Sequence, residues 1–483
     1  MIIVRKPLTH WRRTKIVCTI GPASNSDAII RKLIEAGMDV ARFNLSHGSM
    51  AEHARLVKLV RKVGGELGVE VAVMLDLPGP KHRIGKLAGG QVTLREGEKV
   101  TLTEKQVKGD SRLLPVTLQG FARNVKPGQT VLLDDGALQV RVLRTDGVEV
   151  RGIVTAGGTL IQGRGVVVPG MPNPALFVTK TLQQLILFAI KQHPDYIALS
   201  FVSRPQDIID VRHILEEKGA DIPIIAKIEK QGALESFGGI LQASDAIMVA
   251  RGDLGVEIPL ERVPLVQKDI ISSCNRAGKP VITATEMLQS MVTSVRPVRA
   301  EVSDIANAIF DGTDAVMLSA ETSIGRYPVE AIKMMDKIAI ETEKKFPYNS
   351  TLAERSSWVG NVTEELISYD ACLTAQNLAA RAIVAFTQSG STAGRVSKYR
   401  PQPVILAIAP KEICGRLVLR WGVYPFQAEV VQTPGSISDL FRTAAELAKK
   451  VELAHPGDLI VVTGGLPLGV AGSTNLLKVE KIV

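Results

Sequence analysis

The stretch "IPIIAKIEKQGALESFGGILQASDAIMVARGDLG", residues 222–255, decides the fold because it places a helix between two apolar strands. Residues 222–229 and 245–253 have the pattern of strands, and residues 232–244 have the pattern of a helix. Strands that alternate with helices in this way are typical of a parallel sheet with crossover helices.

The first of these strands carries a lysine and a glutamate two residues apart, Lys227 and Glu229. Alternate residues of a strand point to the same side, so the two side chains share one face. Opposite charges among apolar residues are uncommon unless they are paired or used in function. The pattern leaves two interpretations open, a buried structural ion pair and a working site.

The same alternation extends over residues 15–77 and again over residues 182–345. Together these segments contain eight predicted strands, each followed by a helix. The count predicts a discontinuous (β/α)8 TIM barrel made of residues 1–77 and 169–346.

Two further domains are predicted outside the barrel. Residues 78–168 consist of short β-rich runs divided by glycine turns, which indicates a small all-β unit inserted after the third strand. A polar linker is expected near residues 347–358. Residues 352–483 then alternate again, but with too few repeats for a second barrel, and predict a C-terminal α/β domain with an open sheet.

Composition excludes several classes of protein. The chain has 483 residues, a net charge of +9 and 4% aromatic residues. The charge is either a solubility surplus or a field that attracts anionic metabolites. We expect no nucleic-acid partner because no basic tract is interleaved with aromatics.

Membrane and secretion signals are also not expected. The longest apolar run, residues 185–190, is too short to span a bilayer, and the basic residues 1–13 lack the apolar segment of a secretory leader. Four widely spaced cysteines, with no CxxC pair, indicate reduced thiols and a cytoplasmic protein. The four cysteines are Cys18, Cys274, Cys372 and Cys414.

Polar residues gather where the predicted barrel strands end, which is where barrel enzymes have their active sites. They are Arg42, Asn44 and Ser46 on the second strand, Asp76 on the third, Lys227 and Glu229 on the fifth, Asp253 on the sixth, and Thr283 and Thr285 on the seventh. Each has a structural explanation when taken alone, as a turn residue, a helix cap or a buried pair. Their convergence on one rim favours an active site.

The residue types at this rim suit phosphoryl chemistry. Glu229 and Asp253 are hard oxygen ligands that fit Mg²⁺, or Mn²⁺ in its place. Arg42, Arg83 and Lys227 supply the positive charge that a phosphoryl group in transfer needs. The glycines around Asp253 let a backbone N–H approach an anion closely. No spacing of Cys and His indicates zinc.

Six segments together resemble the pyruvate kinase family. They are "RRTKIVCTIGPAS" (12–24), "VARFNLSHG" (40–48), "AKIE" (226–229), "IMVARGDLGVEIP" (247–259), "ATEMLQSM" (284–291) and "RAEVSDIANAIFDGTDAVMLSAET" (299–322). The resemblance implies a catalytic barrel, a small β-barrel lid (78–168) and a C-terminal regulatory domain. It also implies transfer of a phosphoryl group from phosphoenolpyruvate to ADP in glycolysis, giving pyruvate and ATP, by a cytoplasmic homotetramer.

The resemblance implies a role for each matching residue. Lys227 stabilises charge on the phosphoryl group and the developing enolate, Arg42 contacts the substrate phosphate, and Thr285 borders the enolate. Glu229 and Asp253 hold Mg²⁺, and the backbone of Gly252 approaches the substrate carboxylate. The implied nucleotide-binding residues are Asn44, Leu45, Ser46, His47, Arg83 and Arg164. His47, taken from its own "SHG" segment, either touches the nucleotide or closes a turn.

The segment after the third strand departs from the family. The family pattern "LDTKGPEIRTG" stands here as "LDLPGPKHRIG", residues 75–85. The implied site for a monovalent cation or its substitute comprises Asn44, Ser46, Asp76, Leu77 and Lys81. Leu77 replaces a Thr that binds K⁺, and Lys81 replaces a Glu. The Lys81 ammonium can take over the charge of the cation, so we expect activity without K⁺; the alternative is that Lys81 points to solvent.

The segment "FTQSGST", residues 386–392, places four hydroxyls between a strand and a helix: Thr387, Ser389, Ser391 and Thr392. Hydroxyls and the N–H groups at a helix start form a phosphate cradle or an ordinary N-cap turn. The family places an allosteric phosphate effector here, closed by a loop resembling "GGLPLGVAGSTN" (464–475). A sugar phosphate, a sugar bisphosphate, AMP and no effector all remain open.

The sequence disfavours two rival functions. A catalytically inactive barrel that senses phosphorylated metabolites is disfavoured because Lys227, Glu229, Asp253 and Thr285 are all present. A different phosphoenolpyruvate-handling barrel, a mutase or a lyase, is disfavoured by the β insertion and by Asn44, Arg83 and Arg164.

Overall fold

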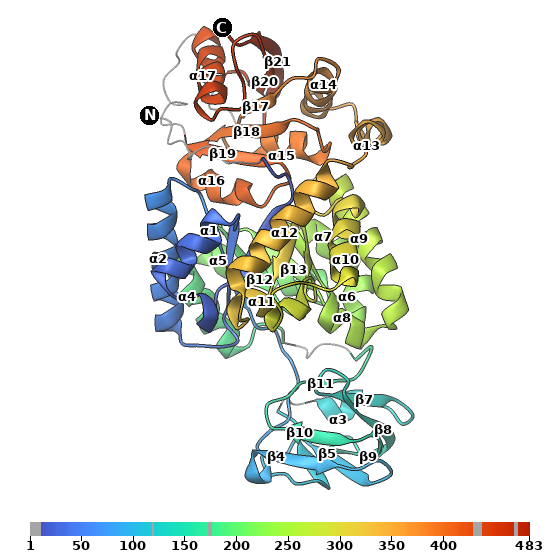
Figure 1. The fold of residues 1–483 in the computed structure, drawn as a ribbon. Coiled ribbons are helices and arrows are strands. Elements are labelled where there is room, and N and C mark those ends of the chain that lie inside the picture. The colour runs from blue at the N-terminus through green and yellow to red at the C-terminus, as the bar shows by residue number, and fades with distance from the viewer. Residues whose placement is uncertain (1–10, 118–119, 172–175, 428–436, 468–471) are drawn as a thin grey trace. The chain divides into compact units, whose positions relative to one another are not determined.

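The computed structural model describes residues 11–117, 120–171, 176–427, 437–467 and 472–483 (Figure 1). The chain divides into two compact units. The first comprises residues Met1–Leu75, Gln192–Ile197 and Lys268–Val483, and the second comprises Asp76–Lys191 and Ala198–Gln267. The predicted domain boundaries cut the chain differently and stay a prediction.

Eight strands form the predicted closed barrel, in the order β1-β16-β15-β14-β13-β12-β3-β2. They are β1 (Lys15–Thr19), β2 (Val40–Asn44), β3 (Ala72–Leu77), β12 (Tyr196–Leu199), β13 (Ile224–Ile228), β14 (Ala246–Ala250), β15 (Val281–Ala284) and β16 (Ala315–Leu318). The strands are buried almost throughout because their residues are apolar on both faces.

Helices follow the strands as predicted. They are α1 (Asp27–Glu35), α2 (Met50–Leu67), α4 (Lys180–Gln192), α5 (Pro205–Glu217), α6 (Gln231–Glu235), α7 (Phe237–Ala243), α8 (Arg251–Glu257), α9 (Val263–Ala277), α10 (Arg299–Asp311), α11 (Ala320–Ser323) and α12 (Pro328–Glu343). Short 3-10 turns are η1 (Pro22–Ser24), η3 (Leu260–Arg262) and η4 (Gln289–Val292).

Two predicted elements in the opening stretch are wrong in detail. The single helix over 232–244 is two helices, α6 and α7, because Ser236 leaves helical geometry with φ −104° and ψ 13°. The strand predicted over 245–253 ends at Ala250, and Arg251 to Asp253 begin helix α8. Asp253 therefore lies in the first turn of a helix and not on a strand.

The inserted segment is all-β as predicted, apart from one turn of α-helix and one 3-10 turn. Its elements are η2 (Ala88–Gly90), β4 (Gln91–Leu94), β5 (Lys99–Thr103), β6 (Leu113–Pro115), α3 (Phe121–Asn124), β7 (Thr130–Leu133), β8 (Leu138–Thr145), β9 (Glu149–Ala156), β10 (Gly158–Ile161) and β11 (Val166–Val167). A six-stranded sheet runs β11-β7-β8-β9-β5-β6, and β10 pairs with β4. Its core is built from alternating residues such as Val100, Leu102 and Val140.

The C-terminal part contains the predicted open sheet, in the order β19-β18-β17-β20-β21. Its elements are α13 (Tyr348–Arg355), η5 (Ser356–Trp358), α14 (Thr363–Asn377), β17 (Ala382–Phe386), α15 (Ser391–Lys398), β18 (Val404–Ala409), α16 (Lys411–Val418), β19 (Val423–Gln427), α17 (Ile437–Lys450), β20 (Leu459–Gly465) and β21 (Thr474–Lys481). The antiparallel strand β21 was not predicted. The polar linker predicted over 347–358 is wrong, because helix α13 buries Leu352 in the core of this sheet.

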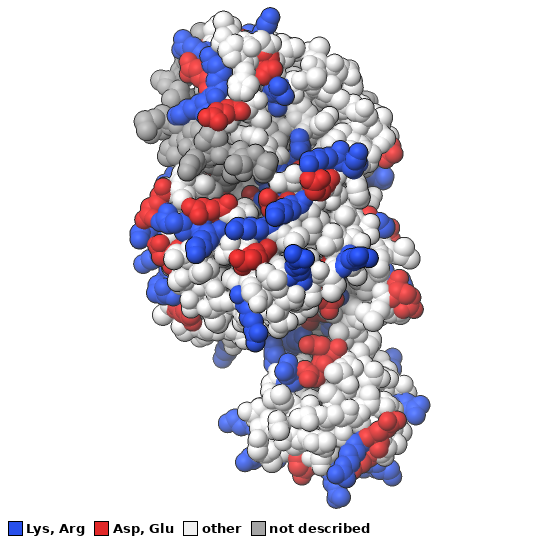
Figure 2. All heavy atoms as spheres, viewed as in Figure 1, with Lys and Arg blue, Asp and Glu red and all other residues white. Residues whose placement is uncertain are grey.

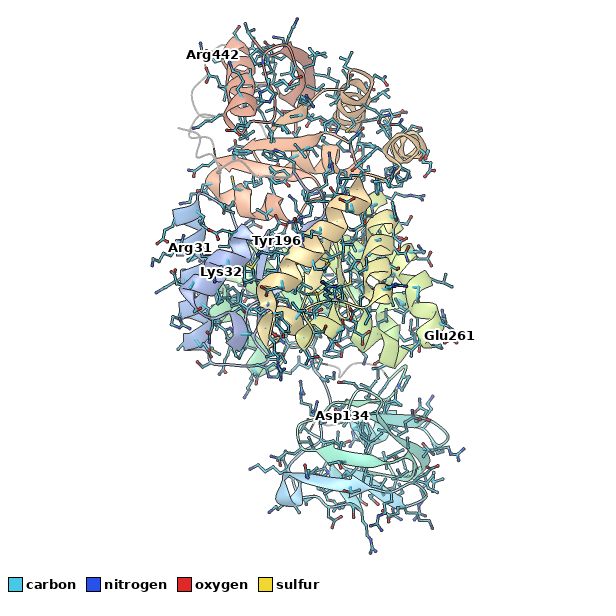
Figure 3. The ribbon with its side chains drawn as sticks, viewed as in Figure 1. Arg31, Lys32, Asp134, Tyr196, Glu261 and Arg442 are labelled. Carbon is cyan, nitrogen blue, oxygen red and sulfur yellow. The ribbon has the colours of Figure 1, made fainter. Side chains whose placement is uncertain are left out.

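Buried polar contacts join the C-terminal part to barrel residues of the same compact unit. The guanidinium of Arg400 lies 3.0 Å from the Asp314 carboxylate, before β16, and both side chains are buried. Lys15 on β1 donates to the carbonyl of Val423 at 2.7 Å. The hydroxyl of Tyr196, a residue labelled in Figure 3, donates to the carbonyl of Arg416 at 2.6 Å.

The surface carries both signs of charge. On the face in Figure 2, Lys and Arg are interspersed with Asp and Glu. No helix in the described ranges has the length and apolar character that crossing a bilayer requires. All four cysteines lie buried as free thiols.

Candidate active site

Lys227 is the centre of a polar cluster in the second compact unit. Its ammonium lies 2.8 Å from Oε1 of Glu229 and 3.3 Å from Oδ2 of Asp76, and it donates to Oγ of Ser200 at 2.8 Å. Glu229 follows the last residue of β13, so the two side chains share one side of the strand as predicted. All four residues are buried. The pair is therefore both buried and part of a larger group of polar side chains.

Glu229 lies in an environment that disfavours its charge. Burial raises the pKa of Glu229; the Lys227 ammonium lowers it, and the negative charges of Asp253 and Asp76 raise it further. The backbone N–H of Phe201 donates to Oε2 of Glu229 at 2.7 Å. The negative charge of Asp253 thus disfavours ionisation of Glu229.

A divalent cation fits this pair of carboxylates. Two hard oxygen donors that repel one another are neutralised by Mg²⁺, which commonly takes one or two protein carboxylates and fills its other positions with water and phosphate oxygens. Within the described ranges, no group of three or more His, Cys, Asp or Glu residues could hold a metal by itself. Mg²⁺ held by these two carboxylates would take its remaining ligands from substrate and water.

Ser200 and Phe201 belong to the cluster, although neither residue was predicted from the sequence. They follow β12, and the Ser200 hydroxyl donates to Oδ1 of Asp76 at 3.2 Å. Phe201 has a left-handed φ of 59°, which is costly for a bulky residue and is typical of functional sites. The signal available was a serine directly after the buried strand 196–199, which is the signal used for the other strands.

Lys81 points toward the cluster and not to solvent. Its ammonium lies 2.9 Å from Oδ1 of Asp253 and 3.8 Å from Asp135, and it lies 5.1 Å from the centre of the Phe201 ring. The solvent alternative is therefore wrong. A cation next to a predicted metal ligand is consistent with the role proposed for Lys81, and the K⁺ requirement itself stays a prediction.

The other residues of the predicted monovalent site are held by local hydrogen bonds. The carbonyl of Leu77 accepts from the Ser200 N–H at 3.1 Å, and its side chain is buried. Oδ1 of Asn44 accepts from the N–H of Ser46 at 3.1 Å. The hydrogen bond between Asn44 and Ser46 is typical of a turn, which is one of the structural roles expected for these residues.

Glycine and an ion pair shape the two crossings between the barrel and the insertion. A Cβ on Gly79 would lie 2.0 Å from the carbonyl oxygen of Ser200, so only glycine fits where the chain passes from β3 into the insertion. On the return, buried Lys230 donates to the carbonyl of Met171 at 2.9 Å. Lys230 also lies 3.9 Å from Glu257 on α8. The two segments that connect the barrel to the insertion thus contact residues at the ends of β12 and β13 and on α8. These three elements also position the polar cluster.

Arg83 and Arg164 lie close to one another within the insertion. The N–H of Ile84 donates to the Arg164 carbonyl at 2.9 Å, and the Arg83 guanidinium donates to the carbonyl of Gly163 at 3.0 Å. The guanidinium of Arg164 lies 3.3 Å from the carboxylate of Asp134, a residue labelled in Figure 3. Both arginines keep exposed guanidinium surface, and their nucleotide-binding role stays a prediction.

The first compact unit positions Arg42 and Thr285 at the ends of their strands. The buried guanidinium of Arg42 donates to Oγ1 of Thr19, on β1, at 2.7 Å. Thr285 follows β15 with φ 69°, Glu286 has φ 58°, and the Thr285 hydroxyl donates to the Ala284 carbonyl at 2.6 Å. Two successive left-handed residues mark strained backbone, which is typical of active sites.

Thr283 does not belong with Thr285. Thr283 is fully buried and its hydroxyl bonds the hydroxyl of Thr313 at 3.0 Å. The expectation that both threonines face the rim is therefore wrong, because the backbone of Thr285 leaves strand geometry directly after Ala284.

The segment after β2 forms a tight turn. The His47 carbonyl bonds Nε2 of His53 at 2.7 Å, and the His47 N–H donates to the Asn44 carbonyl at 3.3 Å. Leu45 is buried, whereas the side chains of Ser46 and His47 are exposed. His47 thus takes part in closing the turn through its backbone, which leaves its imidazole exposed.

The hydroxyls of the predicted effector site already bond to the protein. Oγ1 of Thr387 accepts from the Gly390 N–H at 2.9 Å, and Thr392 pairs with Thr474 at 2.7 Å. The Ser389 hydroxyl donates to that of Ser391 at 3.2 Å. Thr387 thus closes the turn that leads into helix α15, whose N-cap residue is Gly390. Part of the predicted closing loop, residues 468–471, lies outside the described residues.

Comparison with known proteins identifies the family. The pyruvate kinase barrel domain matches residues 11–332, and the α/β domain of pyruvate kinase matches residues 365–480. The chain belongs to the pyruvate kinase family. It is therefore a kinase, and the predicted TIM barrel with a C-terminal α/β domain is confirmed.

Individual pyruvate kinases support the same assignment. The chain is 44% identical over 476 residues to the pyruvate kinase of Sporosarcina psychrophila, covering 98% of this chain and 80% of the relative. It is 42% identical over 474 residues to that of Clostridium acetobutylicum, covering 98% and 100%. A crystal structure of a pyruvate kinase from Cryptosporidium parvum has a TM-score of 0.93 and 34% identity, covering 98% of this chain and 97% of that one.

Proposed function

We propose that this member of the pyruvate kinase family transfers the phosphoryl group of phosphoenolpyruvate to ADP, giving pyruvate and ATP, with Mg²⁺ held by Glu229 and Asp253. The observation that carries the proposal is the buried ammonium of Lys227, 2.8 Å from Glu229. An ammonium with a metal-binding carboxylate beside it stabilises the negative charge that develops on phosphoryl oxygens and on an enolate.

Each residue has a defined part in the reaction. Lys227 stabilises charge on the phosphoryl group, and it is oriented by Asp76 and Ser200. Arg42 binds the substrate phosphate, and the hydroxyl of Thr285 borders the enolate that is protonated. When bound by Glu229 and Asp253, Mg²⁺ would neutralise phosphate oxygens and the two carboxylates together.

The proposal is tested by measuring ADP-dependent formation of pyruvate from phosphoenolpyruvate with Mg²⁺. Lys227→Met should abolish most turnover, whereas Lys218→Met, an exposed lysine after α5, should behave as wild type. Binding of phosphoenolpyruvate without turnover in the wild type would instead indicate an inactive sensor. Equal turnover in Lys227→Met and wild type would refute the mechanism.

We further propose that Lys81 makes the enzyme independent of K⁺. Its ammonium already lies beside Asp253. Initial rates with and without K⁺, at constant ionic strength, should agree, and Lys81→Glu should create a K⁺ requirement. A large K⁺ requirement in the wild type would show that the ammonium does not substitute for the cation.

Regulation and assembly follow from the family as proposals. Thr387 to Thr392 would bind the phosphate of an effector, and the protein would be a cytoplasmic homotetramer. Rates measured with a sugar monophosphate, a sugar bisphosphate and AMP should reveal activation that Thr387→Val and Ser391→Ala remove. Sedimentation equilibrium tests the tetramer, and unchanged activation in both variants would place the effector elsewhere.

A further inference from the structure

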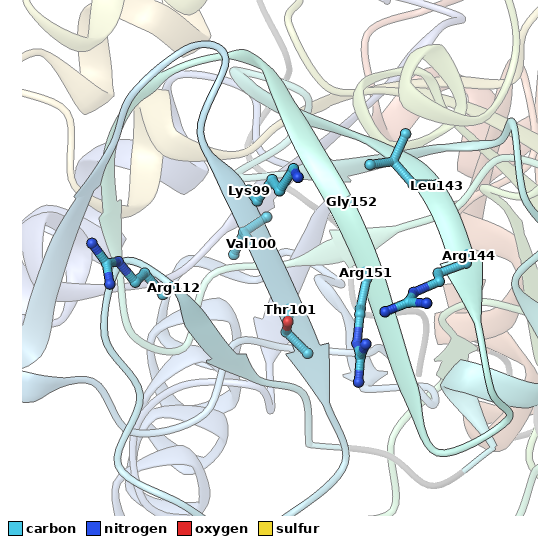
Figure 4. Close-up of a pocket in the computed structure, with 8 residues that line it drawn as sticks. All are labelled: Lys99, Val100, Thr101, Arg112, Leu143, Arg144, Arg151 and Gly152. Atoms are coloured by element: carbon cyan, nitrogen blue, oxygen red, sulfur yellow. The ribbon is translucent and has the colours of Figure 1, made fainter.

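An open concavity of about 510 Å³ lies on the sheet of the insertion (Figure 4). Its lining includes four cationic side chains: Lys99 on β5, Arg112 before β6, Arg144 on β8 and Arg151 on β9. All four are exposed. A concavity of this volume is in the range that accommodates a small molecule.

The pairing of the strands brings the charges together. Arg151 on β9 is the direct partner of Thr101 on β5 and of Arg144 on β8. The β8–β9 register shifts between Val142 and Arg144, and such a bulge turns two successive residues, here Leu143 and Arg144, toward the same face. Like charges directly opposite one another on neighbouring strands are unfavourable, so the sheet accepts a cost to present Arg144 beside Arg151.

None of the four cations forms an ion pair with a described residue, whereas the neighbouring Lys105 lies 2.9 Å from Glu149. The pKa of Asp146 is lowered mainly by backbone N–H groups of Glu149 and Val148, with a smaller contribution from Arg151. A bound anion would supply the charge that the protein does not.

The sequence places most of the excess positive charge in this insertion. Residues 78–168 contain fourteen Lys and Arg and eight Asp and Glu, so this segment alone supplies a net +6 of the chain's +9. The net charge was open to two interpretations, a dispersed surplus or a field for anions. Its concentration in one small domain, with four unpaired cations around one concavity, favours the second.

We propose that this concavity is a binding site for a small molecule with two or more phosphoryl groups, separate from the catalytic residues. Guanidinium groups bind phosphate with paired hydrogen bonds, and Arg144 and Arg151 together can hold adjacent phosphoryl groups. Lys99 and Arg112 add charge from the neighbouring strands. Leu143, which is 50% exposed, provides an apolar contact beside them.

Calorimetric titration of the full-length protein with inorganic pyrophosphate tests the site. The variant Arg144→Gln/Arg151→Gln should bind one pyrophosphate fewer per chain than wild type, or bind it at least tenfold more weakly at the lost site. A matched variant, Arg95→Gln/Arg123→Gln, removes the same charge from exposed positions of the insertion outside the concavity and should bind as wild type. Equal binding by all three proteins, or equal loss in both variants, would overturn the proposal.

Further measurements distinguish loss of the binding site from loss of folding or of catalytic activity. Arg144→Lys/Arg151→Lys keeps the charge without the paired hydrogen bonds, and it should restore part of the binding. The thermal midpoint of the Gln variant should equal or exceed that of wild type, because a repulsive pair is removed. Its pyruvate formation should be unchanged. A fall in turnover would show that the site is part of the catalytic centre, whereas an inactive wild type would refute the proposed reaction and leave the difference in pyrophosphate binding intact.

Discussion

Replacing Ser200 by alanine tests how the reactive ammonium is oriented. Lys227 has oxygen partners on three side chains, with Glu229 and Ser200 both at 2.8 Å and Asp76 at 3.3 Å. A hydrogen bond to a charged group contributes about 1.5–3 kcal/mol. Because both carboxylates remain in the variant, we take the lower end, which corresponds to about a tenfold loss of rate.

The loss should appear in turnover and not in substrate affinity. Ser200 acts through Lys227, so Ser200→Ala should lower kcat about tenfold and change the KM for phosphoenolpyruvate less than about twofold. The variant should stay folded, since a loss of about 1.5 kcal/mol is small beside the roughly 5–15 kcal/mol by which folded proteins are stable. Rates of pyruvate formation over a range of substrate concentrations separate the two constants.

Ser203 provides the matched control for this experiment. It lies three residues further along, and its hydroxyl donates to Asp207 at 3.3 Å, in the first turn of α5. Ser203→Ala should therefore leave both constants unchanged. Unchanged kcat in Ser200→Ala, or the same loss in Ser203→Ala, would refute the idea that the serine orients the ammonium.

Two further predictions concern stability. Asp314→Ala removes the partner of buried Arg400, a loss of about 3–5 kcal/mol, whereas Lys105→Ala breaks an exposed pair worth at most about 1 kcal/mol. Thermal melting should show a much larger fall for Asp314→Ala, and equal midpoints would contradict this reasoning. Burial, with Lys230 nearby, lowers the pKa of His82 to about 4. Between about pH 6.5 and pH 4, the imidazole of His82 is therefore protonated in the unfolded state but neutral in the folded state. The contribution of neutral His82 to the free energy of unfolding is present above about pH 6.5 and is lost as the pH falls toward 4. His82→Leu should lose less thermal stability than wild type between pH 7 and pH 5; an identical loss would show that His82 is not responsible.

Much of the fold followed from periodicity. Apolar strands and amphipathic helices alternate regularly enough to predict the barrel, the all-β insertion and the open sheet. The errors arose where local pattern was ambiguous. The polar segment 347–358 contains Leu352, which is buried in the core of the C-terminal sheet. The segment "RGD" after β14 begins a helix, although glycine disfavours helices.

The sequence predicted which residues belong to the candidate site better than it predicted the contacts between them. Lys227 and Glu229 were placed on one face because the side chains of a strand alternate, and this required no tertiary information. Ser200 was missed because a single serine after a strand resembles any turn residue. Thr283 was wrongly included because the left-handed backbone at Thr285 cannot be inferred from an alternating pattern.

By itself, the order of residues determined the strand and helix periods, the sides on which charges lie and the excess of positive charge in the insertion. Only the tertiary structure decided that Lys81 meets Asp253, that Lys227 meets Asp76 and Ser200, and that Arg144 stands opposite Arg151. The physical reason is that local geometry depends on neighbours in the chain, whereas these contacts join residues brought together by strand pairing and by the packing of distant segments.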